Sequence, residues 1–261
     1  MKEYKAILLA VENNVATLTI NQPESLNALT VEILREIGSA LDVVEADESI
    51  KVLVVTGSGE KSFVAGANIK GFVEMDQEAG EAFSKLGNEV FYKLSTLRQP
   101  TIAAVNGYAL GGGTELALAC DIRIASENAV FGQPEVGLGI PPGFGGTQRL
   151  PCLINPAIAK ELIFTGRNVR SDEAERIGLV NKVVSQTDLM AETLKLAEQI
   201  MKNAPLAVEK SKQLINAGLD MDLADGLQLE SEGFGLLFTT EDQKIGAKAF
   251  IEKEKPTFNR K

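Results

Sequence analysis

Short runs of apolar and β-branched residues alternate with amphipathic stretches through the first half of the chain. The runs 7–10 and 15–20 flank Asn13 and Asn14, which is the pattern of a β-hairpin. Further buried-strand patterns cover residues 52–55, 102–105 and 122–125. Apolar residues recur at helical spacing in two segments, at Ile33, Ile37, Leu41 and Val44, and at Ala79, Phe83, Leu86, Val90, Leu94 and Leu97.

This alternation of strands and helices predicts an α/β fold. Two strands and one helix recur along the chain, which suggests a repeating structural turn, although the repeat is one of topology and not of sequence. The triple glycine 111–113 is expected to open a further helix, and the segment 143–150 to form another tight entry into a helix.

The strand pattern stops after about residue 200. Pro205 suits the first turn of a helix. A later segment fits a capping box, with Thr240 as N-cap and the Gln243 side chain reaching back to it. We therefore divide the chain into a core of residues 1–200 and a helical region of residues 201–261. The local pattern fits a solvated helical tail and an oligomer-forming or lid element equally well.

The composition narrows the class of protein. Of 261 residues, 44% are hydrophobic and 24% are charged, which is typical of a globular protein. The formal net charge of -10 argues against binding to nucleic acid or to an anionic membrane. The N-terminal segment lacks the apolar run of a signal peptide, and no stretch approaches the roughly 20 apolar residues that cross a bilayer. We expect a cytoplasmic protein without a nucleic-acid or membrane partner.

Carboxylates are the leading candidates for proton transfer, because the chain contains no histidine. That absence also excludes Ser-His-Asp and Cys-His schemes and zinc sites that need imidazole. Glu115 directly follows the glycine-rich segment 111–114, and Glu135 ends the segment 131–135. A poorly solvated pocket at these positions would raise the pKa of a carboxyl into the useful range. The two cysteines have no metal-ligand spacing, and Cys120 is expected to be buried.

Backbone donors are the second candidate feature. The small residues 65–67 let a ligand approach the main chain closely, and 111–113 lies where a strand turns into a helix. Helix N-termini expose unpaired N–H groups and a partial positive charge. Two such donors from separate segments could hold an oxygen that becomes negative during a reaction.

Each of these features also has a simpler interpretation. Turn geometry accounts for many triple glycines, and Glu115 could be an ordinary carboxylate in the first turn of a helix. Gln133 could orient Glu135 or bond to the backbone. The segment 143–150 resembles a phosphate loop but lacks its Gly-Lys-Ser/Thr ending.

The combination of segments is more specific than any of them alone. Ala65-Gly66-Ala67-Asn68-Ile69 is followed by 104–115, which reads AVNGYALGGGTE, and then by 131–150. In this order they closely resemble the crotonase superfamily, and specifically its enoyl-CoA hydratases. The likeness extends from Asn21 to Lys253, and its details are most similar to short-chain bacterial 3-hydroxybutyryl-CoA dehydratases.

The resemblance implies a crotonase-like spiral of stacked ββα turns with a C-terminal helical region that trimerises, two trimers forming a homohexamer. It implies an oxyanion hole made by the N–H groups of Ala67 and Gly112, which would bind the thioester carbonyl. Glu115 and Glu135 match the two catalytic glutamates, and the N–H of Gly143 would place the reacting water. The substrate-binding residues implied by the family are Ser25, Leu26, Ala65, Ala67, Asn68, Ile69 and Gly112, with Phe250 and Lys253 reaching a neighbouring subunit's CoA.

The sequence departs from the family pattern at three positions. Asn68 stands where aspartate is usual, which affects the charge near the oxyanion loop but not the Ala67 amide. Thr114 replaces a frequent cysteine, which we interpret as a packing change. Glu24 occupies a position where many relatives carry a lysine near the CoA phosphates, so nucleotide affinity would rest more on Lys253.

The activity implied is the reversible hydration of a short trans-2-enoyl-CoA, with CoA as part of the substrate and no metal or other cofactor. Family members that only shift a double bond commonly retain one of the two glutamates, so the pair favours addition or removal of water. The alternatives are enoyl-CoA isomerisation or acyl-CoA thioester hydrolysis. A non-catalytic RNA-binding or scaffold role is disfavoured by the net charge of -10.

Overall fold

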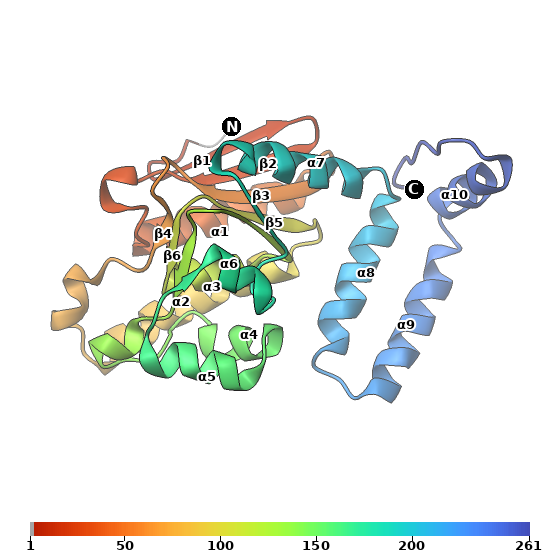
Figure 1. Cartoon of the computed structure of the whole chain (residues 1–261). Helices are drawn as coiled ribbons and strands as arrows, with labels where there is room; N and C mark the ends of the chain where they lie inside the picture. Colours follow the sequence, from red (N-terminus) through yellow and green to blue (C-terminus); the bar gives the residue numbers. More distant parts are fainter. Residues whose placement is uncertain (1–2) are drawn as a thin grey trace.

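The computed structural model describes residues 3–261; Met1 and Lys2, which begin the predicted core domain, lie outside the described residues. Its strands are β1 (Ile7–Glu12), β2 (Val15–Ile20), β3 (Val52–Gly57), β4 (Ser62–Ala65), β5 (Thr101–Val105), β6 (Tyr108–Leu110), β7 (Ile122–Ser126), β8 (Val130–Gly132), β9 (Val169–Arg170) and β10 (Lys182–Val184). They form a six-stranded sheet of order β1-β2-β3-β5-β7-β10 and a four-stranded sheet of order β4-β6-β8-β9 (Figure 1).

The predicted hairpin is confirmed. β1 and β2 pair antiparallel, with Glu12 opposite Val15. The two connecting residues, Asn13 and Asn14, have φ angles of 50° and 66°. Positive φ at both central positions is what a tight two-residue hairpin turn requires, and asparagine tolerates it better than most residues.

The predicted ββα recurrence is also confirmed. β3, β5 and β7 lie parallel in the large sheet, and β4, β6 and β8 lie parallel in the small one. Each pair of strands is followed by a helix: α2 (Gln77–Thr96), α3 (Gly112–Ala119) or α4 (Gly146–Leu153). The second strand of each pair has only three or four residues, and sequence periodicity did not identify it.

Helices cover both faces of the six-stranded sheet. In β3, Leu53 and Val55 point into the main core, whereas Val52 and Val54 belong to a smaller cluster that packs against α7 (Leu189–Met201). The main core also includes the predicted apolar face of α1 (Val31–Ala46), at Ile33, Ile37, Leu41 and Val44.

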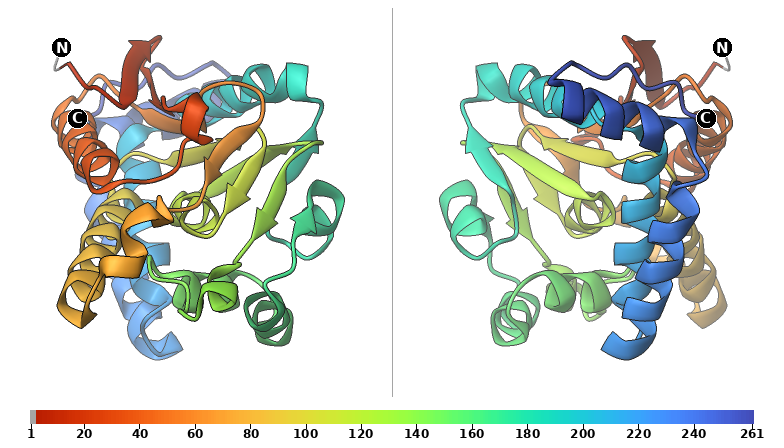
Figure 2. Two further views of the ribbon diagram at one scale, coloured as in Figure 1. Left: turned by 90° about the vertical axis from the view of Figure 1, so that its left-hand side faces the viewer. Right: turned by 90° about the vertical axis from the view of Figure 1, so that its right-hand side faces the viewer.

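The N-terminal part of α2 is less buried than its apolar spacing predicts. Val90, Leu94 and Leu97 are buried, but Phe83 and Leu86 are only half-buried and Ala79 is exposed. The first turns of α2 therefore project beyond the core, next to the short helix η2 (Ile69–Glu74). Figure 2 shows these two segments at one edge of the molecule.

The C-terminal region is helical, as predicted, with α8 (Pro205–Gly218), α9 (Leu223–Leu237) and α10 (Glu241–Glu252). α8 and α9 form an antiparallel pair beside the core (Figure 1). The predicted capping box forms only in half. Thr240 Oγ1 accepts from the Gln243 N–H at 3.2 Å, but the Thr240 N–H donates to the Leu237 carbonyl at 3.1 Å instead of to the Gln243 side chain.

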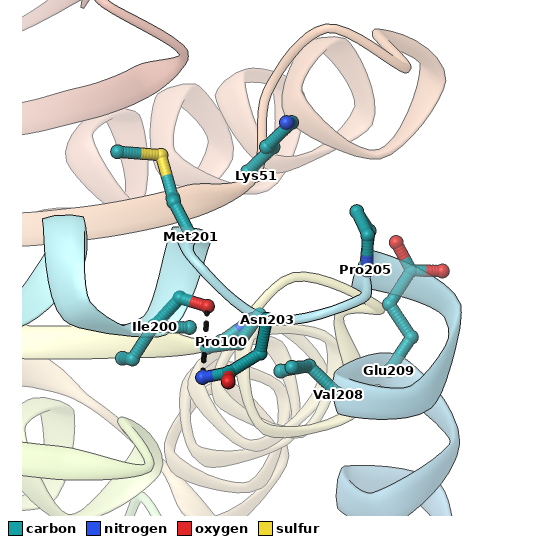
Figure 3. Close-up of a pocket in the computed structure, with 8 residues that line it drawn as sticks. All are labelled: Lys51, Pro100, Ile200, Met201, Asn203, Pro205, Val208 and Glu209. Atoms are coloured by element: carbon teal, nitrogen blue, oxygen red, sulfur yellow. Dashed lines mark hydrogen bonds between the residues drawn. The ribbon is translucent and has the colours of Figure 1, made fainter. Parts of the chain in front are cut away.

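Buried polar contacts fasten α8 to the core. Lys212 Nζ lies 2.7 Å from Asp121 Oδ2 and donates to the Gln99 carbonyl at 3.0 Å. A small hollow at the junction of α7 and α8 is lined by Lys51, Pro100, Ile200, Met201, Asn203, Pro205, Val208 and Glu209 (Figure 3). None of the predicted site residues lines this hollow, so it is separate from the site described next.

The remaining helices connect these parts. They are α5 (Pro156–Thr165), α6 (Ser171–Arg176) and the short helices η1 (Pro23–Ser25), η3 (Glu135–Leu138) and η4 (Gln186–Asp188). Cys120 follows the last residue of α3, and its side chain is buried, as expected. Burial raises the pKa of its thiol to about 12.

Candidate active site

The site forms where β4 and β6 end side by side. In the parallel register of these strands, Ala65 lies opposite Leu110. Beyond the strands, Ala67 and Gly112 both lie beside Leu29, which forms a bridge with Ala67 and has a side-chain carbon 3.1 Å from the position of a Cβ at Gly112. A Cβ atom at Gly113 would lie 1.9 Å from the Val64 carbonyl oxygen, so only glycine lets α3 approach β4 this closely.

Two main-chain N–H groups are available at this point. Leu29 bridges the segment through its N–H to the Gly66 carbonyl and its carbonyl to the Asn68 N–H, both at 2.8 Å. The intervening Ala67 N–H therefore points away from the bridge. Gly112 is the first residue of α3, where the N–H has no carbonyl within the helix. Across residues 3–261, neither N–H forms a hydrogen bond, so both can bind a ligand oxygen.

Glu115 lies in the first turn of α3, with 1% of its surface exposed. Its Oε1 accepts the N–H groups of Phe144 at 2.8 Å and Gly146 at 2.7 Å. Burial raises the pKa of this carboxyl, and the two N–H donors and the positive Arg149 oppose the rise. Its burial and its two N–H donors distinguish Glu115 from an exposed carboxylate in the first turn of a helix.

Glu135 lies near Glu115, at the first position of η3. A Cβ atom at Gly111, which has a φ of 49°, would lie 2.6 Å from Glu135 Oε1, so this glycine also makes room for a carboxylate. Burial raises the pKa of Glu135 to about 7, and the negative charge of Glu115 adds to the rise. The two glutamates are therefore close enough to interact and differ in their surroundings.

Gln133 orients Glu135, which decides the alternative left open by the sequence. Its side chain is buried, and with the amide nitrogen turned toward the carboxylate it donates to Oε2 at 3.0 Å and to Oε1 at 3.1 Å. Only this orientation gives both the nitrogen and the oxygen of the Gln133 amide a suitable partner.

Thr114 does more than fill space. Its buried hydroxyl donates to the Ala109 carbonyl at 2.6 Å and lies 3.0 Å from the Gly132 carbonyl, and it accepts the Gly132 N–H at 3.2 Å. The packing interpretation is therefore incomplete, because this side chain joins α3 to both β6 and β8.

Most of the predicted substrate-binding residues lie together. Ser25 and Leu26 end η1 beside β4, where the Leu26 carbonyl accepts the Ala65 N–H at 3.0 Å. Ile69 follows the segment 66–68, which contains the Ala67 N–H, and is 49% exposed. Asn68 accepts the Lys70 N–H at 3.2 Å and thereby caps η2, a role that its amide oxygen fills without a charge.

Phe250 and Lys253 do not join these residues within one chain. Phe250 is 87% exposed on α10, and Lys253 follows the end of that helix in the left-handed conformation, with φ of 59°. Lys253 is thus the residue that ends the helix. α10 lies at the opposite side of the structure from η2 (Figure 1).

Three residues of the site were not singled out from the sequence. Ser84 Oγ and Asn88 Nδ2 of α2 donate to the Gly143 carbonyl at 2.6 and 2.9 Å. Arg149 Nη1 donates to the Phe144 carbonyl at 3.0 Å. Ser84 and Asn88 are four residues apart and half-buried on α2, and this polar pair was the available signal.

Two classes of feature are absent from residues 3–261. No group of three or more Cys, Asp or Glu side chains there could hold a metal ion. None of the helices in the same residues is long and apolar enough to span a membrane.

Comparison with known proteins places this geometry in a family. The model of the enoyl-CoA hydratase/isomerase family matches residues 10–261. The chain is 54% identical to a short-chain-enoyl-CoA hydratase of Clostridium acetobutylicum over 97% of both chains, and 49% identical to a crotonyl-CoA hydratase of Syntrophomonas wolfei over 98% of both. An enoyl-CoA hydratase structure from Bacillus anthracis superposes with a TM-score of 0.95 at 39% identity, covering 98% of this chain and all of that one. A chain with one buried and one half-buried glutamate beside two unpaired amides, matched over this length, belongs to the enoyl-CoA hydratase/isomerase family.

Proposed function

We propose that this chain is a hydro-lyase that adds water to a short trans-2-enoyl-CoA, such as crotonyl-CoA, and removes it from the 3-hydroxyacyl-CoA product. The observation that carries the proposal is the pair Glu115 and Glu135, two carboxyls of unequal environment that face one space beside two free N–H groups. The hydratases of Clostridium acetobutylicum and Syntrophomonas wolfei, by their names, support the short-chain substrate class.

The thioester oxygen would lie between the N–H groups of Ala67 and Gly112. As water adds to C3, negative charge develops on this oxygen, and donors fixed in advance stabilise it. Removing one such donor from an oxyanion hole typically costs about 2.7–4 kcal/mol of transition-state stabilisation. The partial positive charge at the start of α3 acts in the same direction.

The two glutamates divide the proton transfers. Burial raises the pKa of Glu115, and two N–H groups favour its ionised form against that rise; we assign it to take the proton from water. Glu135, with its pKa raised to about 7, still holds a proton near neutral pH and can deliver it to C2. The hydroxide goes to C3, and the N–H of Gly143 would help to place the water. In dehydration the roles exchange.

This mechanism uses only main-chain and carboxyl groups of the chain and the CoA thioester itself. It requires no metal and no redox group. The CoA path would run along Ser25, Leu26, Ala65 and Ile69, which lie around the segment 66–68.

We further propose that the C-terminal helices assemble trimers, and that two trimers form a hexamer. A hollow of about 250 Å³ lies between α8, α9 and α10, and its lining includes Phe234, Leu237 and Phe238. Large apolar side chains around it are exposed in the single chain, which is typical of an interaction surface. Assembly would also bring Phe250 and Lys253 to a neighbour's CoA. The cytoplasmic location stays a prediction from the sequence.

Incubation with crotonyl-CoA in ¹⁸O-labelled water tests the reaction class. We expect 3-hydroxybutyryl-CoA that carries one ¹⁸O at C3, and no release of free CoA. A product with a shifted double bond and no label would indicate isomerisation, and free CoA would indicate thioester hydrolysis. An inert chain that instead shifts RNA in a salt-dependent manner would overturn the proposal in favour of a binding role.

A further inference from the structure

The loop 143–146 is held on both of its sides by side chains that point at it from helices. On its inner side, the N–H groups of Phe144 and Gly146 donate to Glu115. On its outer side, Ser84 and Asn88 of α2 donate to the Gly143 carbonyl. The Gly143 carbonyl and the Phe144 N–H belong to one peptide unit.

We propose that Ser84 and Asn88 are positioning residues that set the orientation and the proton affinity of Glu115 through this peptide unit. The inference rests on the proposed function, because it concerns the group that would take the proton from water. Neither side chain needs to touch the substrate for this role.

The peptide unit passes the orientation of its carbonyl on to its N–H. The unit is planar and trans, so its carbonyl and its N–H point in opposite directions. Two donors at 2.6 and 2.9 Å that fix the carbonyl therefore also aim the N–H at Glu115 Oε1, 2.8 Å away. Donors to the carbonyl polarise the unit and strengthen its N–H as a donor.

Helix α2 supplies two donors to the same carbonyl. Ser84 and Asn88 are one helical turn apart, and the Asn88 amide also lies 3.4 Å from the Ser84 hydroxyl. One donor would satisfy the half-buried carbonyl, but the structure supplies two that also contact each other. The Phe144 ring adds rigidity, since it packs edge-to-face against Phe83 and Phe91 of the same helix at 5.1 and 5.6 Å.

Charged groups on neighbouring elements also act on Glu115. Arg149 of α4 lowers the pKa of Glu115 by its positive charge, and Glu135 of η3 interacts with it as a like charge. On α2, the ionic neighbours of the pair, Lys85 and Glu89, are exposed. Loss of the α2 donors would leave these charges in place. It would weaken only the contact between the Phe144 N–H and Glu115 Oε1. A carboxylate that loses a donor to its charged form has a higher pKa.

The test is the pH dependence of kcat for crotonyl-CoA hydration in Ser84→Ala and Asn88→Ala. We expect kcat to fall about tenfold in each, with KM changed less than about twofold, since the contact acts on the reacting group and not on binding. The acidic limb, where protonation of Glu115 stops the reaction, should move to higher pH by about half a unit. Ser84→Thr keeps a hydroxyl and should retain the wild-type profile.

Ser95→Ala is the matched control, because Ser95 lies on α2 and donates to the Tyr92 carbonyl without contacting the loop. It should leave both kcat and the acidic limb unchanged. Folded Ser84→Ala and Asn88→Ala variants with an unmoved acidic limb would overturn the inference, even if kcat fell. If wild-type protein hydrates crotonyl-CoA and Glu115→Gln abolishes this, such a result rejects the positioning role alone. An unaffected Glu115→Gln would instead reject the proposed function.

Discussion

At the scale of single residues, two identical side chains acquire different chemistry from their surroundings. Glu115 is almost fully buried, and two N–H donors and Arg149 offset part of its burial. Glu135 is held by Gln133, and burial together with the charge of Glu115 raises its pKa to about 7. Unequal proton affinities in one site are the usual basis of an acid and base pair.

The charge of Glu115 should be visible in the titration of Glu135. Glu115→Gln removes a like charge, so we expect the pKa of Glu135 to fall from about 7 toward the ordinary glutamate range. Carbon-13 NMR of labelled glutamate carboxyls measures this directly. Glu198→Gln, an exposed position on α7, serves as the control and should leave the Glu135 titration unchanged. An unchanged Glu135 pKa in Glu115→Gln would show that the two carboxyls do not interact.

At the scale of elements, the site depends on how closely α3 approaches β4. A Cβ at Gly113 would lie 1.9 Å from the Val64 carbonyl oxygen, whereas a Cβ at Gly80 of α2 would meet nothing within 4 Å. Both glycines are helical, and they provide a matched pair of Gly→Ala substitutions.

Gly113→Ala should destabilise the protein by about 3 kcal/mol or more, because the backbone of β4 must move. It should also reduce activity, since Ala67 and Gly112 would separate. Gly80→Ala should be neutral or stabilising by up to about 1 kcal/mol, because alanine favours helix. Chemical denaturation of both variants checks this. Equal effects of the two substitutions would contradict the close approach seen in the structure.

The strands and helices with long patterns could be predicted from the sequence, and the short ones could not. The spacing at Ile33, Ile37, Leu41 and Val44 corresponds to α1, and the all-apolar run 52–55 to β3. β4, β6 and β8 are too short for a period of two to show, and their pairing partners are distant in sequence.

The same limit applies to the site. Glu115, Glu135 and the two amide segments stand in recognisable glycine-rich sequence. Ser84 and Asn88 contact Gly143 across 59 and 55 residues, so no local pattern links them. The orientation of Gln133 depends on how β8 leads into η3, which only the folded structure shows. The capping box at Thr240 was half wrong because the preceding turn takes up the Thr240 N–H.

At the scale of the whole molecule, the C-terminal helices are fixed to the core but leave an apolar surface uncovered. Glu209 of α8 pairs with both Arg98 and Arg260 at 3.1 Å, and so joins the helix to the core and to the C-terminal segment. Phe234, Leu236 and Phe238 are all more than half exposed in the single chain. A neighbouring copy of the chain would cover them, which is the basis of the proposed hexamer.

Such assembly predicts a shared substrate site. Lys253→Ala should raise KM for crotonyl-CoA with kcat nearly unchanged, because an ammonium near the CoA phosphates contributes binding and not catalysis. The KM difference should shrink at high salt, where the contact is already screened. Lys244→Ala, at an exposed position within α10, is the control and should leave KM unchanged. A chain that is monomeric by sedimentation and fully active at the same concentration would contradict the shared site.

The central claim is that Glu115 and Glu135 act together on one water. It is tested most directly by kcat for crotonyl-CoA hydration in Glu115→Gln, in Glu135→Gln and in the double variant, with the fold checked by circular dichroism. Each single substitution should lower kcat by at least about 10²-fold, since each removes a positioned proton carrier. The double variant should be little worse than the worse single one, because the two groups act as a unit. A folded single variant with kcat within about threefold of wild type, or losses that multiply in the double variant, would contradict the account.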